Sequence, residues 1–142
     1  MKNSLKPGLT HTHRFTVTDA KTVPSLYPES DVIAAMPRVF ATGFMVGLME
    51  WACIELMRPH LDPGEGSLGI HIDVAHTAAT PPGMTVTVEA RVEAVEGKRI
   101  DFTVVARDDL DEIGRGRHRR GGVVEDKFRA RVAEKAAKAR PA

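Results

Sequence analysis

The stretch that decides the fold is residues 40–58, FATGFMVGLMEWACIELMR. It could form about five turns of helix, with apolar side chains on nearly every side. A helix without a polar face is usually enclosed by the rest of its protein. Pro59 and the turn Asp62-Pro63-Gly64 end the pattern, because proline cannot continue a helix. We therefore expect one long buried helix over residues 40–58.

The remaining regular segments have the pattern of β-strands. In residues 84–95 and 98–107, apolar side chains alternate with polar ones, as in an antiparallel sheet with one dry and one wet face. The predicted strands are residues 13–18, 69–80, 84–95, 98–107 and 113–124. The fold class is therefore α+β, with a curved antiparallel sheet wrapped around one long apolar helix, which is the arrangement of the hot-dog fold. The exposed edges of such a sheet favour a homodimer.

A chain of 142 residues is long enough for one domain, and we expect a single domain over residues 1–142. Residues 1–10 are mostly polar and contain Pro7 and Gly8, which predicts a loose N-terminal arm. Residues 19–37 contain three prolines and are expected to form a lid-like loop with one short helix over residues 32–36. Residues 126–142 are rich in alanine and charged side chains, which predicts a charged tail that is helical over residues 126–139.

The composition argues against several classes of function. Hydrophobic residues make up 42% of the chain and charged residues 27%, as in ordinary globular proteins. A formal net charge of +1 gives no electrostatic footprint for a nucleic acid. The N-terminus lacks the apolar region of a signal peptide, and no apolar stretch could cross a bilayer, so no membrane partner is expected. The six histidines have no metal-ligand spacing apart from His11 and His13, so we expect no metal site.

The only cysteine, Cys53, lies within the apolar run of residues 49–57. One cysteine cannot form an internal disulfide, which favours a reducing, cytoplasmic location. Its position indicates a small buried hydrophobic side chain rather than a reactive thiol.

Glu50 lies in the middle of the predicted helix. Its helical neighbours three and four positions away are uncharged, so its partner must come from elsewhere in the fold. His76 is a candidate, because the alternation over residues 69–80 places it on the same face as Ile72 and Val74. Each residue also has a structural interpretation, as a hydrogen-bonded core acid and a core histidine. The two together favour a functional site.

Thr42 and Gly43 lie near the start of the predicted helix. A threonine there is commonly an N-cap. The position also suits catalysis, because free backbone N–H groups and the helix dipole stabilise a developing oxyanion. Gly43 and Gly47, one turn apart, leave a stripe of helix surface that a sheet or a substrate could approach closely.

These positions belong to stretches that resemble a known family. The stretches are residues 37–53, PRVFATGFMVGLMEWAC, residues 64–69, GEGSLG, and residues 76–90, HTAATPPGMTVTVEA. They resemble the fluoroacetyl-CoA thioesterases, a family of hot-dog enzymes, and the likeness extends to residues 21–30 and 111–116. The resemblance implies a catalytic threonine, glutamate and histidine at Thr42, Glu50 and His76. It also implies an acyl-CoA substrate without a separate cofactor, and a backbone contact for the thioester at Gly69.

One departure from the family concerns the acyl pocket. The member specialised for fluoroacetyl-CoA closes this pocket with phenylalanines from the loop before the helix, and the corresponding positions here are Ile33 and Met36. Both are apolar but neither has a ring, so the resemblance does not imply strict selectivity for a fluorinated acyl group. The basic run RGRHRR of residues 115–120 is either a solvated strand end or a contact for the CoA phosphates, with Arg120 the best match to the family.

The resulting hypothesis places the thioester carbonyl between the helix start and His76. Glu50 acts as the nucleophile or as the base that activates water, and His76 donates a proton to the departing thiolate. Thr42 hydrogen-bonds the reacting centre or Glu50. Two alternatives are a hot-dog hydratase that acts on an enoyl-CoA, and a non-catalytic acyl-CoA-binding module. The second would gain nothing from the cost of burying an unpaired glutamate.

Overall fold

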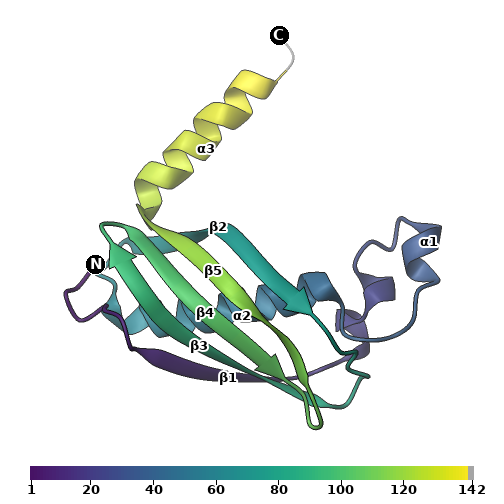
Figure 1. Ribbon diagram of the computed structural model, residues 1–142. Helices are drawn as coiled ribbons and strands as arrows, with labels where there is room; N and C mark the ends of the chain where they lie inside the picture. The colour runs from purple at the N-terminus through teal and green to yellow at the C-terminus, as the bar shows by residue number, and fades with distance from the viewer. Residues whose placement is uncertain (141–142) are drawn as a thin grey trace.

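The structure, a computed structural model, describes residues 1–140. Five strands form one antiparallel sheet in the order β1-β3-β4-β5-β2, and the sheet curves around one long helix, α2 (Figure 1). The predicted α+β hot-dog architecture is confirmed. Helix α2 is Thr42–Met57, and the strands are β1 Thr10–Thr16, β2 Glu65–His76, β3 Thr85–Glu96, β4 Arg99–Arg107 and β5 Glu112–Val124.

The core lies between the concave face of the sheet and one face of α2. In β4, Ile100, Phe102, Val104 and Ala106 are buried, and the residues between them point to the outer face. Strand β3 follows the same alternation. Burial of each large apolar side chain contributes about 1.5–3 kcal/mol, so these two strands supply much of the driving force that holds the sheet on the helix.

The opposite face of α2 is open in the single chain. Trp51 and Ile54 are 45% and 41% exposed, whereas Met45 and Met49 are fully buried. The expectation of a helix buried on all sides is therefore wrong for one chain, because the sheet covers only the side that faces its concave surface. Cys53 lies on the buried side, and burial raises the pKa of its thiol to about 12, which fits the predicted packing role.

Several segments differ from the sequence-based expectation. Strand β1, Thr10–Thr16, begins three residues earlier and ends two residues earlier than predicted. Strand β2 begins at Glu65 and ends at His76, because the chain enters it directly from the turn at Gly64, whose φ of 82° suits glycine. The first residues do not form a loose arm. The terminal amine of Met1 lies 2.6 Å from Glu65 Oε1, and Leu5 packs into the core at 5% exposure.

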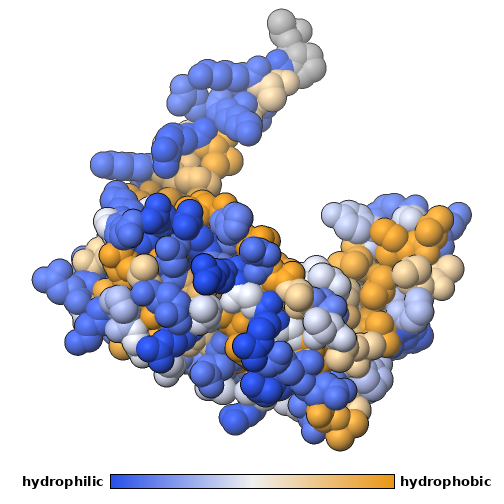
Figure 2. Space-filling view, in the orientation of Figure 1, coloured by the Kyte–Doolittle hydropathy of each residue, from blue (hydrophilic) through white to orange (hydrophobic). Residues whose placement is uncertain are grey.

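Two segments project beyond opposite ends of the sheet (Figure 1). The lid, residues 19–37, contains two 3-10 turns, Asp19–Lys21 and Val23–Ser25, and the short helix α1, Asp31–Ala34. Helix α3, Glu125–Ala139, leaves the opposite end, and none of its residues is buried. Figure 2 shows apolar side chains over much of the lid. No helix within residues 1–140 is long and apolar enough to cross a membrane.

Candidate active site

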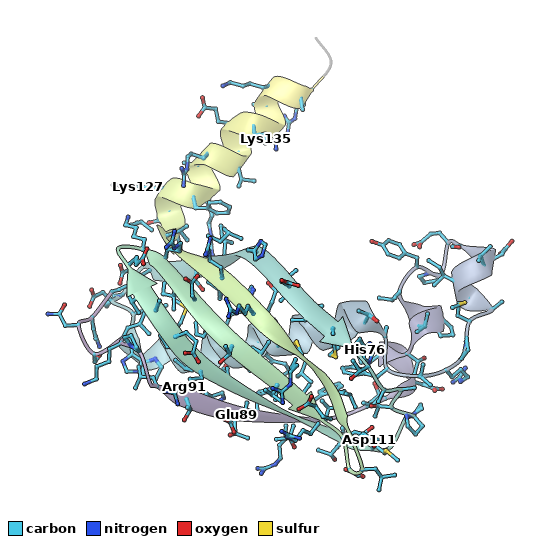
Figure 3. The ribbon with its side chains drawn as sticks, in the orientation of Figure 1. His76, Glu89, Arg91, Asp111, Lys127 and Lys135 are labelled. Atoms are coloured by element: carbon cyan, nitrogen blue, oxygen red, sulfur yellow. The ribbon has the colours of Figure 1, made fainter. Side chains whose placement is uncertain are left out.

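His76 ends β2 beside the start of α2 (Figure 3). Its Nδ1 lies 2.8 Å from Oγ1 of Thr42, the first residue of the helix. The N-cap is Ala41, and no side chain caps the helix there. The interpretation of Thr42 as an N-cap is therefore wrong. Its hydroxyl instead holds the His76 ring in one orientation.

The second nitrogen of the His76 ring, Nε2, is buried and has no hydrogen-bond partner among residues 1–140. Burial lowers the pKa of His76, and a backbone hydrogen bond at Ala78 only partly offsets this effect. The ring is therefore neutral near pH 7, with one nitrogen available to a partner from outside the chain. A buried polar atom without a partner in the protein often contacts water or a ligand.

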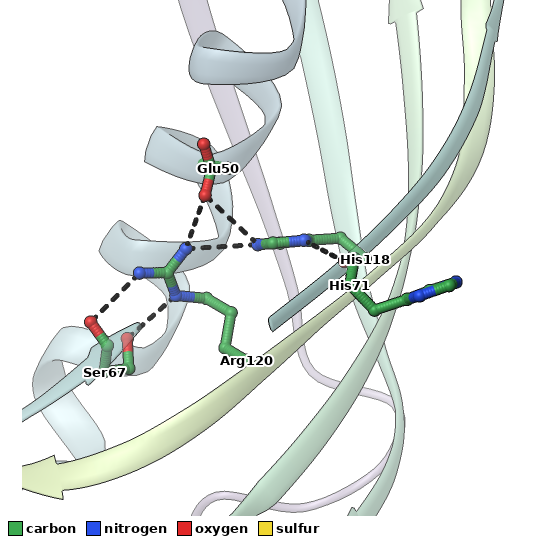
Figure 4. Close-up of polar contacts among 5 residues, drawn as sticks. All are labelled: Glu50, Ser67, His71, His118 and Arg120. Carbon is green, nitrogen blue, oxygen red and sulfur yellow. Dashed lines mark hydrogen bonds and ion pairs between the residues drawn. The ribbon is translucent and has the colours of Figure 1, made fainter. Parts of the chain in front are cut away.

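Glu50 forms a second polar cluster, with residues of β5 (Figure 4). Its Oε1 lies 3.2 Å from Nη1 of Arg120 and 3.9 Å from Nε2 of His118. The expectation of a partner from a distant part of the chain is correct, but within one chain the partner is Arg120 and not His76. The Glu50 side chain is 36% exposed, so one side of the carboxylate is open to solvent.

Arg120 holds Glu50 from inside the fold. Its side chain is only 4% exposed, and its Nε and Nη2 donate hydrogen bonds to Oγ and the backbone oxygen of Ser67, at 2.8 and 3.0 Å. Nη1 contacts both Glu50 and His118. In a single chain the guanidinium therefore faces Glu50 and Ser67 inside the fold. The contact of Arg120 with the CoA phosphates stays a prediction.

Gly69 makes room for this carboxylate. A Cβ at this position would lie 2.4 Å from Glu50 Oε1, closer than any real contact, so the carboxylate can occupy this place only beside a glycine. The pairing of β2 with β5 shifts register between Gly69 and His71, which marks a β-bulge at this point. A hollow of about 390 Å³ opens next to the carboxylate, and Val46, Gly69 and Ile70 contribute to its lining.

The two clusters are separate within one chain. Thr42 and Glu50 are eight residues apart on α2, which corresponds to about 12 Å along the helix axis. The structure thus brings Thr42 together with His76, and Glu50 together with Arg120 and Gly69. It does not bring the predicted catalytic glutamate and histidine into contact.

The remaining predicted substrate contacts lie on or near the lid. Ile33 is part of α1 and is half-buried, and Met36 is 47% exposed just after this helix. Gly43 follows Thr42 on α2, and a Cβ there would lie 3.2 Å from Leu26 of the lid. The missing side chain therefore lets the base of the lid pack on the start of the helix.

Ser67 and His118 belong to the Glu50 cluster but were not predicted from the sequence. The alternation of β5 offered a signal for His118, because residues 118 and 120 share the face that points to α2. For Ser67 the sequence has no signal, since its contact with Arg120 depends on the pairing of β2 with β5. Within residues 1–140, no group of three or more histidine, cysteine or acidic side chains could hold a metal ion.

Comparison with known proteins identifies the family of the chain. A family of fluoroacetyl-CoA-specific thioesterases matches residues 17–126. The fluoroacetyl-CoA thioesterase of Streptantibioticus cattleyicolor is 56% identical over 135 residues, which cover 95% of this chain and 97% of that protein. A solved structure of a fluoroacetyl-CoA thioesterase superimposes with a TM-score of 0.91 at 56% identity, covering 92% of this chain and 97% of that one. A variant of that enzyme has been solved with fluoroacetate and CoA bound.

More distant structures share the same architecture. A thioesterase superfamily member from Thermus thermophilus is 31% identical, with a TM-score of 0.82 over 94% of this chain and 96% of that one. A hot-dog-like protein from Thermanaerovibrio acidaminovorans, at 24% identity and a TM-score of 0.77 over 91% of both chains, supports the fold alone. With the match to the family model spanning most of the chain, the protein belongs to the fluoroacetyl-CoA-specific thioesterases, a family of thioester hydrolases with the hot-dog fold.

Proposed function

We propose that this acyl-CoA thioesterase hydrolyses its short acyl-CoA substrate at a site completed by two copies of the chain. Thr42 and His76 of one protomer would face Glu50 of its partner. The observation that supports the proposal is the separation of two clusters within one chain. Thr42 with His76 and Glu50 with Arg120 lie about 12 Å apart along α2.

A single two-fold axis can bring the halves together. Glu50 lies beside Gly69 of β2, and Thr42 lies beside His76, so helix and strand run past each other with both clusters facing the same edge. The midpoint between Thr42 and Glu50 is Val46, which lines the hollow beside β2. An axis through this point makes the two helices antiparallel, and each Thr42 then lies opposite the Glu50 of the other copy.

The edge formed by β2 is suited to such pairing. Strand β2 is at one end of the sheet order, so one side of its backbone pairs with β5 and the other side is free. Ile70 and Ile72 on this strand are 58% and 39% exposed. A long exposed edge with apolar side chains is a template for another strand, and here the natural partner is β2 of a second copy. A homodimer with a continuous sheet is the assembly we infer.

The chemistry follows from the groups that would meet. The Glu50 carboxylate attacks the thioester carbonyl, or takes a proton from the water that does so. The carbonyl oxygen accepts hydrogen bonds from backbone N–H groups at the start of α2, beside Thr42 and Gly43, where no side chain caps the helix. The C–S bond breaks and the CoA sulfur accepts a proton from His76 Nε2. The ring regains a proton from the attacking water, directly or through Glu50, so that water supplies both the hydroxyl of the free acid and the proton of the thiol. CoA is part of the substrate, so the scheme requires no separate cofactor.

The lid residues favour a substrate with a short, apolar acyl group. Ile33 and Met36 offer an apolar cover without the flat ring that a fluorine-selective pocket would use. We therefore infer a general preference for short acyl-CoA esters. The direct test is thiol release from acetyl-CoA and fluoroacetyl-CoA side by side. Comparable turnover of both supports the proposal, whereas a strong preference for the fluorinated ester would contradict the inferred breadth.

The same assay separates thioester hydrolysis from the two alternatives. A hydratase would not release thiol from a saturated acyl-CoA, and a binding module would bind it without turnover. Family membership disfavours both. The Glu50→Gln variant should lose most turnover while its melting temperature stays close to that of the wild type. Full turnover in this variant would overturn the role of Glu50. The Ile72→Lys variant should be monomeric in sedimentation and inactive, and an active monomer would overturn the shared site.

A further inference from the structure

We propose that His118 is a positioning residue of this thioesterase: it fixes the guanidinium of Arg120 and, through it, the carboxylate of Glu50 (Figure 4). The inference rests on the proposed catalytic role of Glu50. It adds a residue that acts through Arg120 and determines where the carboxylate lies.

The two ring nitrogens of His118 have partners that leave only one protonation state. Nδ1 lies 2.8 Å from the backbone oxygen of His71, and a carbonyl can only accept, so Nδ1 carries the proton. Nε2 lies 3.1 Å from Nη1 of Arg120, and a guanidinium can only donate, so Nε2 is unprotonated and accepts. The ring is therefore a neutral acceptor aimed at Arg120.

This acceptor completes the hydrogen bonding of Nη1 of Arg120. Nη1 has two N–H bonds, and its two acceptors are Glu50 Oε1 at 3.2 Å and His118 Nε2 at 3.1 Å. Ser67 takes the bonds from Nε and Nη2. The guanidinium is planar, so these contacts together fix both its position and its plane. Without the acceptor at residue 118, Nη1 of Arg120, which donates the hydrogen bond to Glu50, is no longer held in place.

The ring itself has little freedom. His118 is 2% exposed, and its ring lies 6.3 Å from that of Phe102, tilted by 24°. A Cβ at Gly69 would be only 3.1 Å from Cε1 of the ring, so the bulge of β2 packs closely against it. The ring is thus held from three sides, by β4, by β2 and by its own strand.

The charged surroundings keep the ring in this state. Arg120 faces it from β5, Glu50 and the Cys53 thiol lie on α2, and β2 contributes the His71 carbonyl together with the His71 imidazole. Burial is the largest effect and lowers the pKa of His118; the charge of Arg120 acts in the same direction, and the hydrogen bond to the His71 carbonyl and the charge of Glu50 offset only part of it. A proton on Nε2 would point at an N–H of Arg120, so a charged His118 would separate the guanidinium from Glu50.

Two substitutions separate the positioning role from a purely structural one. His118→Gln keeps an acceptor at the end of the side chain, where Nε2 faces Arg120, but loses the donor to His71. His118→Asn keeps a donor near the Nδ1 position but leaves Arg120 without its acceptor. Both variants are neutral, polar and smaller than histidine, so they serve as controls for each other.

We expect the kcat of His118→Gln to stay within about threefold of the wild type, and that of His118→Asn to fall by about tenfold to a hundredfold with little change in KM, the size of effect that a misplaced catalytic group produces. Melting temperatures of the two variants should be similar. The reverse order, with an active asparagine variant and an inactive glutamine variant, would show that His118 only ties β5 to β2. Wild-type kcat in both variants would also overturn the proposal.

A second measurement needs no variant. Nitrogen NMR of the wild-type enzyme at pH 7 should show His118 with a protonated Nδ1 and an unprotonated Nε2. A proton on Nε2 would overturn the positioning role. Neither result depends on Glu50 being catalytic, which the turnover of Glu50→Gln decides separately. An active Glu50→Gln enzyme would overturn the proposed function while the protonation state of His118 stays as described.

Discussion

The hydroxyl of Thr42 lies 2.8 Å from Nδ1 of His76, and this contact leaves Nε2 as the only nitrogen of the ring that can exchange a proton with a ligand. The pair joins the start of α2 to the end of β2. Each member depends on the other: the threonine fixes the ring, and the ring gives the hydroxyl a partner in place of a helix cap.

Removal of the hydroxyl should therefore act through the histidine. Thr42→Ala is expected to lower kcat by about tenfold to a hundredfold, because the ring loses the bond that orients it. Thr42→Ser retains the hydroxyl and should stay within a few fold of the wild type. Steady-state thiol release checks both variants. An alanine variant with the activity of the serine variant would show that the hydrogen bond has no catalytic role.

The stability of the protein should fall in mild acid. Burial lowers the pKa of both His76 and His118 below the ordinary value of 6.5, so the unfolded chain binds protons at these residues more readily than the folded chain. Above pH 6.5 both histidines are neutral in the folded and the unfolded chain, and their contribution to stability is fully present. This contribution is lost as the pH falls from 6.5 through the lowered pKa values of the folded protein. Melting temperatures at pH 7.5 and 5.5 measure the effect.

The control for this measurement is His118→Gln, which removes one of the two buried histidines. Its melting temperature should depend less steeply on pH over the same interval. An equal slope in the variant and the wild type would mean that His118 does not contribute to the loss of stability in acid.

Gly69 should be essential for activity although it has no side chain. In Gly69→Ala the new methyl group would lie 2.4 Å from Oε1 of Glu50, so the carboxylate must move. A catalytic group displaced by about 1 Å can cost about a hundredfold in kcat, and we expect a loss of this size. Gly47→Ala is the matched control, because a Cβ there meets nothing within 4 Å and alanine favours the helix by roughly 0.5–1 kcal/mol. Equal activity of the two variants would contradict the proposed position of the catalytic carboxylate.

The parts of the structure that were predicted from the sequence are those set by local pattern. The apolarity of residues 40–58 defines α2, and the alternation in β2 correctly turns His76 towards it. The partner of Glu50 could not be found in this way. Arg120 is 70 residues away, and its contact depends on the pairing of β5 with β2 and on the bulge after Gly69. Leu5 was missed for a similar reason, because its burial depends on packing and not on its neighbours in sequence.

A mixture of two impaired variants, each with a substitution in a different half of the site, tests the shared site most directly. Thr42→Ala and Glu50→Gln are combined in equal amounts, allowed to exchange subunits and assayed for thiol release. Half of the dimers are then mixed, and in each mixed dimer one of two sites combines an intact Thr42 with an intact Glu50, so about one quarter of wild-type activity should return. Activity no greater than the sum of the two separate variants, in a mixture shown to contain mixed dimers, would contradict a site built from two protomers.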